Sequence, residues 1–353
     1  MQTQFKKFHI LVGILVVLLA LAACGAPVPT PVPPTAIPPQ PTLAPTAVPP
    51  TAIPAQPTLA PTLAPTAVPT QTPPVEFTLT DAAGRSVTLK GIPTRIVSLA
   101  PSNTEIVCAL GACDKLVGVD QFSDFPALVK TLPKLSDGFN PNYEQVIAAK
   151  PDLVLVASIS SPDVVKKFDE LKIPTLMIGA VNSSFESVKQ DIQLVGKAIG
   201  AELQAAQVTA DMDKKLAELE TKLAAAKTKP RVFWELDATD PAKPFTPGPG
   251  TFVHEIIVLA GGENIAGNAA SPYIQMNAEE IIKANPEVII LSDAAYGVAP
   301  ESVGKRPGWD VIDAVKKNKV FPIDDNLVSR PGPRVVEGLE AAAKLIHPEL
   351  FTP

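Results

Sequence analysis

The chain has 353 residues and a formal net charge of −6, so it lacks the basic excess expected of a nucleic-acid-binding protein. Of its 40 prolines, 18 lie between residues 25 and 75, a window without any charged residue. The rest of the chain after that window is roughly 278 residues long, near the upper limit for one compact domain and natural for two lobes.

The N-terminus has the pattern of an export signal. Lys6 and Lys7 precede an apolar run over residues 10–23, which is too short for a membrane span of about 20 residues. The run ends in the sequence LAACG, with Cys24 in fourth place. This ending resembles the lipobox of bacterial lipoproteins, which implies cleavage after residue 23 and a diacylglycerol on the Cys24 thiol. An acylated Cys24 would anchor the protein to a membrane on its outer side.

Residues 24–75 are expected to form a tether. Residues 34–49 and 50–65 are near copies of one proline-rich unit of 16 residues. Proline at every third or fourth position forbids helix and sheet and favours extended polyproline II. The segment is either a stiff spacer or a disordered linker, and in both cases it separates the anchor from a globular unit.

The chain from residue 76 to 200 is predicted to be an α/β lobe. It begins with a hairpin that turns at residues 81–84, and Ser102 with Glu105 predicts a capping box at the start of a helix. Strands and helices then alternate, which favours a mainly parallel sheet. The expected strands are 95–100, 116–119, 152–157 and 174–178, and the expected helices begin at 101 and cover 143–150 and 163–171.

Residues 229–353 repeat this alternation and predict a second α/β lobe. Helices are expected over 251–260, 279–285 and 335–345, and strands over 231–236, 287–291 and 320–323. Residues 142–155 (NYEQVIAAKPDLVL) align with residues 277–290 (NAEEIIKANPEVII) without a gap. The simplest explanation is a duplication that produced two similar lobes.

Residues 201–228 are expected to connect the lobes. Residues 202–227 contain no Gly or Pro and are rich in Ala, Leu, Lys and Glu, so they predict one long helix. Such a helix spans about 39 Å at 1.5 Å per residue, enough to cross from one lobe to the other. A single stiff crossing leaves a cleft between the lobes.

Several segments resemble a known family. Residues 92–105 (IPTRIVSLAPSNTE), 109–111 (ALG), 116–119 (LVGV), 124–126 (DFP), 150–155 (KPDLVL) and 331–334 (PGPR) are similar in sequence and order to the iron-siderophore/cobalamin substrate-binding proteins of ABC importers. The resemblance covers residues 76–350. It implies two lobes joined by one helix, a metal chelate held between them, and delivery to a permease and its ATPase. We also expect a monomer without a resident cofactor.

The resemblance also implies a docking surface. Family members carry one acidic residue on each lobe that meets arginines of the permease, and these positions match Glu144 and Glu279. Both belong to the duplicated helix, although a solvated helix glutamate is the ordinary fate of such a residue.

The ligand is expected at the carboxyl ends of the strands. The candidate binding residues are aromatic, polar or basic side chains after strands: Ser102, Asn103, Phe122, Phe139, Trp234, Tyr273, Tyr296 and Arg330. Ser102 and Asn103 have helix capping as an alternative role, Trp234 has the core, and Arg334 is assigned to the start of a helix. Gly138 stands where the repeat relation to Tyr273 would ask for an aromatic residue. The ligand stays open between cobalamin and a ferric siderophore or haem.

Other functions fit the sequence less well. The chain after the leader has only His254 and His347, too few for capture of a bare transition metal. It has no GxSxG, phosphate-loop or HExxH motif, so no enzyme is expected. A surface lipoprotein without a transport role, such as an adhesin or sensor, remains the alternative. Cys108 and Cys113 are predicted to be buried free thiols, although a disulfide is permitted outside the cell.

Overall fold

The computed structural model describes residues 75–179 and 183–351, which belong to one compact unit of the chain, Thr70–Pro353. The predicted signal peptide, Cys24 and the tether up to residue 74 lie outside the described residues. Among the described helices, none is both long and apolar enough to cross a bilayer.

The N-terminal lobe is built on a five-stranded parallel sheet with the order β5-β4-β3-β6-β7. A two-stranded antiparallel hairpin precedes it. The strands are β1 Glu76–Thr80, β2 Ser86–Lys90, β3 Ile96–Ser98, β4 Leu116–Asp120, β5 Lys134–Ser136, β6 Leu153–Ala157 and β7 Thr175–Ile178. The helices are α2 Pro101–Ala109, α3 Tyr143–Ala148, α4 Pro162–Glu170 and α5 Phe185–Ile199. The sheet is parallel because each crossover passes through a helix or a long loop.

The C-terminal lobe has a four-stranded parallel sheet with the order β10-β8-β12-β13. A second small antiparallel pair joins β9 and β11. The strands are β8 Arg231–Glu235, β9 Phe245–Pro247, β10 Glu263–Asn264, β11 Tyr273–Gln275, β12 Val288–Leu291 and β13 Val320–Pro322. The helices are α7 Phe252–Leu259, α8 Ala278–Ala284, α9 Pro300–Val303, α10 Asp313–Lys316, α11 Asp325–Val328 and α12 Val335–Ile346. The predicted α/β fold with two mainly parallel sheets is confirmed.

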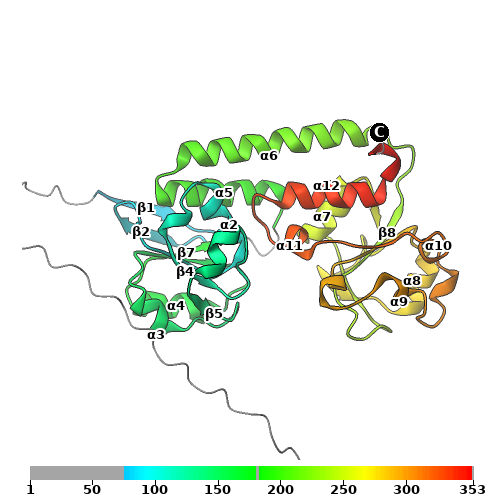
Figure 1. Ribbon diagram of the computed structural model, residues 1–353, viewed down its shortest axis with the longest axis horizontal. Helices are drawn as coiled ribbons and strands as arrows, with labels where there is room; N and C mark the ends of the chain where they lie inside the picture. The colour runs from blue at the N-terminus through cyan, green and yellow to red at the C-terminus, as the bar shows by residue number, and fades with distance from the viewer. Residues whose placement is uncertain (1–74, 180–182, 352–353) are drawn as a thin grey trace, which may run out of the picture. The chain divides into compact units, whose positions relative to one another are not determined.

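The long helix α6, Glu202–Leu223, packs on α5 of the first lobe and on α12 of the second (Figure 1). Gly196 of α5 permits the first contact, since a Cβ at that position would lie 2.6 Å from the Cβ of Ala205. At the other end, the Lys222 ammonium lies 4.7 Å from the centroid of the Phe351 ring. One helix therefore contacts both lobes, as the sequence predicts.

The duplication seen in the sequence recurs in the hydrogen bonds. The backbone N–H of Arg95 donates to Asp152 at 2.9 Å, and that of Arg231 donates to Glu287 at 3.1 Å. Each arginine also donates through Nε to two carbonyls at or just after the end of the repeated helix, α3 in one case and α8 in the other. In both lobes the same pair of arginine and acid thus connects the start of a sheet strand, β3 or β8, to the end of the repeated helix.

Two predictions around α2 are wrong. The helix begins after Ala100 without a side-chain cap, so Ser102 and Glu105 do not form a capping box. Glu105 instead reaches the C-terminal lobe, where arginines bind it. Because Pro101 occupies the first helical position and has no N–H to cap, the helix starts two residues earlier than the capping pattern requires.

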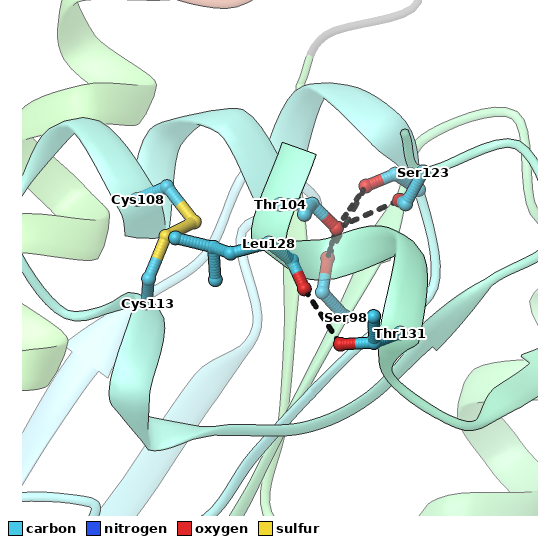
Figure 2. Close-up of a disulfide and its surroundings, with 8 residues drawn as sticks. Ser98, Thr104, Cys108, Cys113, Ser123, Leu128 and Thr131 are labelled. Carbon is cyan, nitrogen blue, oxygen red and sulfur yellow. Dashed lines mark hydrogen bonds between the residues drawn. A yellow bond between two sulfur atoms is a disulfide. The ribbon is translucent and has the colours of Figure 1, made fainter. Parts of the chain in front are cut away.

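Cys108 and Cys113 form a disulfide, so the prediction of free thiols is also wrong (Figure 2). The chain reverses at Gly111, which has a φ of +76°, a backbone conformation that glycine adopts without a Cβ clash. The Ala112 N–H donates to the Val107 carbonyl at 3.1 Å and holds this turn. The reversal brings the two Cα atoms within 4.4 Å, a separation that sequence spacing alone does not show.

Candidate functional site

A cleft of about 290 Å³ is lined by residues of both lobes. In the N-terminal lobe the lining comes from segments that follow the carboxyl ends of β3, β6 and β7. These parallel strands all end at the same edge of their sheet, so the residues that follow them are brought together. The cleft is therefore where an α/β fold is expected to bind a small molecule.

Ser102 and Asn103 form the first turn of α2 in the wall of this cleft. Asn103 is only 1% exposed, and its Nδ2 has no hydrogen-bond partner among the described residues. An unpaired buried donor costs about 1–3 kcal/mol, so such groups are normally satisfied by a ligand or a water. Asn103 thus belongs to the cleft wall and carries a donor that no described group uses.

Asp191 of α5 also lines the cleft, although its side chain is largely buried. Its Oδ1 accepts a hydrogen bond from the Gly179 N–H at 3.0 Å. Burial raises the pKa of Asp191 to about 6, because the charged carboxylate loses water that this one bond only partly replaces. The N-terminal wall therefore offers a donor at Asn103 and an acceptor at Asp191.

The C-terminal wall is mainly apolar. Leu236, Phe252 and Val253 line it, and the half-exposed ring of Tyr273 stands at the start of β11. An aromatic ring and aliphatic side chains suit a ligand with a large flat apolar surface. The lining of this lobe is completed by the loop of Val328, Ser329, Arg330 and Pro331.

Arg330 reaches from this loop across to the N-terminal lobe. Its guanidinium donates to Asp124 at 2.7 Å, to Glu105 at 3.2 Å and to the Phe122 carbonyl at 3.1 Å. Arg334 makes a two-pronged bond to Glu105, at 2.6 and 2.9 Å, and its guanidinium lies 3.9 Å from the centroid of the Phe125 ring. Two arginines of one lobe are therefore matched by two carboxylates of the other.

Four of the predicted ligand-binding residues line the cleft, namely Ser102, Asn103, Tyr273 and Arg330. Three others do not. Phe122, Phe139 and Tyr296 are all more than half exposed, and none of them is part of the cleft lining. A position after a strand does not by itself decide whether a side chain turns into a cleft or out to solvent.

Gly138 has a structural reason to lack the aromatic side chain that the repeat relation suggests. A Cβ at this position would lie 2.6 Å from Cε2 of the Phe122 ring, and the residue has a φ of +100°. The Phe122 ring therefore occupies the space that a side chain at Gly138 would need.

Trp234 belongs to the core, so the proposal that it binds ligand is corrected. Its side chain is fully buried among apolar residues of the C-terminal lobe. The indole N–H donates to the Ser292 hydroxyl at 2.8 Å, which satisfies its only polar atom. The strand β8 lies between two others, so its alternate residues point into packed layers on either side.

Asp191 and the interlobe role of Glu105 were not predicted from the sequence. A signal for Asp191 exists, because it lies on the apolar face of α5 with Val188 and Val195, three residues before and four after it. An acidic residue at a core position of an amphipathic helix is unusual, so it indicates a candidate functional residue. For Glu105 no such signal exists, because its partners are more than 200 residues away in sequence.

Glu144 and Glu279 occupy equivalent, exposed places in the two lobes. Each is the second residue of its helix, after a capping asparagine, Asn142 in α3 and Asn277 in α8. Both caps accept a backbone N–H three residues further on. The duplicated segment thus places the two glutamates in the same way in both lobes.

In the part of the chain that the structure describes, no three His, Cys, Asp or Glu side chains are placed to hold a metal ion. His254 contacts Asn264 at 3.0 Å, and His347 contacts Glu349 at 3.1 Å. Each of the two histidine side chains thus contacts another side chain of the protein.

Comparison with known proteins agrees with the architecture. Residues 96–327 match the family model described as periplasmic binding protein. An uncharacterized ABC transporter substrate-binding lipoprotein of Bacillus subtilis is 37% identical over 277 residues, which cover 78% of this chain and 86% of the relative.

Two further proteins are similar. A cobalamin-binding protein of Halobacterium salinarum is 29% identical over 280 residues, covering 76% of this chain and 73% of the relative. The crystal structure of a possible iron-binding (periplasmic solute-binding) protein from Staphylococcus epidermidis superposes with a TM-score of 0.65 at 28% identity, covering 72% of this chain and 99% of that one. Both likenesses span the two lobes.

Proposed function

The chain belongs to the periplasmic binding protein family and is an extracytoplasmic solute receptor of an ABC importer, and we propose that its ligand is a cobalamin-type metal chelate. The observation that carries the proposal is the cleft between the lobes, with apolar walls, Tyr273 and a few polar groups. A corrin ring offers the flat apolar area that such walls suit. Ser102, Asn103, Tyr273 and Arg330 are the residues proposed to hold the ligand.

A relative described as cobalamin-binding supports this ligand over a ferric siderophore. The proposed ligand is a ready-made chelate, so its metal already has its own ligands. This agrees with a described cleft whose lining has no histidine, cysteine or methionine.

The decisive experiment is a thermal-shift titration of the full chain, purified in detergent, with cyanocobalamin, haem and a ferric siderophore. A ligand at 100 times its Kd stabilises the folded state by about 2.7 kcal/mol, which gives a clear rise in Tm. Cyanocobalamin should raise the Tm, and replacing Tyr273 with Ala should reduce the rise. If no chelate shifts the Tm, the chain is better explained as a surface lipoprotein with an adhesive or sensory role.

We also propose that Cys24 carries the lipid anchor and that the receptor works as a monomer at the outer face of the cell membrane. The LAACG ending and the lipoprotein relative support the anchor. Cys24→Ser should abolish labelling by radioactive fatty acid and leave the protein uncleaved or released from the membrane. Unchanged labelling of this variant would contradict the anchor.

Delivery to the permease is proposed to use Glu144 and Glu279. Their equivalent exposed places on α3 and α8 support this role, because two matched negative charges can orient the receptor on a symmetric membrane partner.

A further inference from the structure

The cleft has no unbalanced positive charge. Among the described residues that line it, only Asp191 and Arg330 have side chains of an acidic or basic type. Arg330 already donates to Asp124 and Glu105, and the side chain of Glu105 is only 2% exposed. An anionic ligand would have to compete with these two carboxylates for the guanidinium of Arg330, whose side chain is itself only 12% exposed.

The polar groups of the N-terminal wall are instead suited to neutral partners. Asn103 holds an unpaired Nδ2 donor at 1% exposure. Around it the first turn of α2 has no side-chain cap, so this helix end favours an oxygen acceptor. The acceptor on the same wall is Asp191, whose Oδ1 is bonded to Gly179.

We propose that this wall recognises neutral carboxamide groups of the ligand, with Asn103 donating to an amide oxygen and Asp191 accepting from an amide N–H. The inference rests on the proposed function and adds what the cleft selects for. A carboxylate in the place of the amide has no N–H to offer Asp191 and sets a second negative charge beside it. Burial raises the pKa of Asp191 to about 6, which shows that this surrounding already disfavours negative charge.

The test uses matched ligands that differ only in this group. The corrin ring carries several carboxamide side chains, and single ones can be hydrolysed to give cyanocobalamin monocarboxylic acids. Isothermal titration of the full chain at pH 7.5 should show that at least one monoacid binds about tenfold or more weakly than cyanocobalamin, equivalent to about 1.4 kcal/mol. Haem and its bis-amide form a second pair, in which the amide should bind more tightly.

Two variants connect the preference to the named residues. Asn103→Leu should lower the affinity for cyanocobalamin about tenfold while the ligand-free Tm stays the same or rises, since an unpaired buried donor is removed. A merely structural role would lower the Tm instead. Asp191→Asn should bring the amide and acid forms within about threefold of each other, because the new side chain can donate as well as accept.

A matched control is Gln193→Leu, which removes a side-chain amide from the exposed face of α5 and should change neither affinity nor preference. Equal binding of the amide and acid forms by the wild-type protein would overturn the inference and leave the proposed function intact. So would an unchanged affinity of Asn103→Leu. Failure of all four ligands to bind would overturn the proposed function itself.

Discussion

Asp293 is a buried carboxyl group at the carboxyl end of β12, next to a second acid. It is only 4% exposed, its Oδ2 accepts from the Ala238 N–H at 3.0 Å, and its Oδ1 has no partner among the described residues. The neighbouring Glu235 is fully buried and is held by Arg306 through two bonds, at 2.5 and 2.8 Å. Arg306 thus forms its hydrogen bonds with Glu235 and acts on Asp293 only through its charge.

Burial first, and the charge of Glu235 second, raise the pKa of Asp293 to about 7 from an ordinary value of 3.8. The folded state therefore binds more protons than the unfolded state between these pH values, so this group lowers stability as pH rises from about 4 to 7. Asp293→Asn should be more stable than wild type at pH 8.5, on the order of 2 kcal/mol, and about equal to it near pH 4.

Thermal unfolding of both proteins across this pH range measures the difference. Asp310→Asn, which changes an exposed aspartate of the same lobe, is the control and should follow the wild-type curve. A variant that is less stable than wild type at pH 8.5 would show that the Asp293 charge is better compensated than its contacts indicate.

Along its length, the helix α2 contacts three different parts of the molecule. Its first turn faces the cleft, Glu105 in its middle binds the other lobe, and its end is joined to the following turn by the disulfide. The Thr104 hydroxyl donates to Ser98 at 2.8 Å and lies at the same distance from the Ser123 hydroxyl, which fixes the helix to the sheet below (Figure 2). These hydrogen bonds, the ion pairs of Glu105 and the disulfide thus hold the helix on several sides.

The disulfide is expected to add modest stability because it closes a short loop. Cys108→Ser with Cys113→Ser should lower the free energy of unfolding by about 2 kcal/mol, since the entropy gained by the unfolded chain depends on loop length. Thermal unfolding with and without dithiothreitol measures the effect. The reductant should lower the Tm of the wild type and leave the double variant unchanged. A Tm of the wild type that does not respond to complete reduction would contradict a stabilising role.

Ion pairs and a hydrogen bond join the two lobes in addition to the helix α6. Glu105 and Asp124 of the first lobe bind Arg330 and Arg334 of the second. On another part of this boundary, Glu255 of α7 accepts from the N–H of Phe185 at the start of α5, at 3.0 Å. These polar contacts hold the two lobes in a defined relation around the ligand cleft.

Glu105→Gln should weaken this connection strongly. Removing one partner of a buried ion pair typically costs about 3–5 kcal/mol, because the other charge stays buried without compensation. Here two arginines lose their shared carboxylate, so a Tm drop of several degrees is expected. Glu337→Gln, an exposed acid of α12 close to Arg334, is the control and should have little effect. Equal, small effects of both changes would mean that the lobes are held by α6 and apolar packing alone.

Charge reversal of the two matched glutamates tests transport separately from capture. Glu144→Lys with Glu279→Lys should leave ligand affinity within about threefold, under roughly 0.7 kcal/mol, because both residues are exposed and outside the cleft lining. Uptake through the cognate importer should collapse, since lysines would oppose the expected permease arginines. Loss of ligand binding with intact docking to permease vesicles would assign these residues to the pocket.

The elements and their repetition could be predicted from the amino-acid sequence. Apolar runs bounded by proline and glycine predict β6, β12 and α8 because burial and backbone sterics act over a few residues. The duplicated segment that contains Glu144 and Glu279 could be found by alignment alone, and the two lobes and α6 follow from the same local patterns. The family resemblance then predicted the type of function and part of the cleft.

Which side chains contact one another could be seen only in the folded protein. Trp234 and Tyr273 look alike as aromatic candidates, yet one is enclosed by its sheet and the other lines the cleft. Glu105 finds Arg330 and Arg334 far along the chain, and Asn103 is left without a partner by the same packing. Local sequence fixes the direction of the backbone over one element. The surroundings of a side chain depend on every element packed around it, and those elements come from distant parts of the chain.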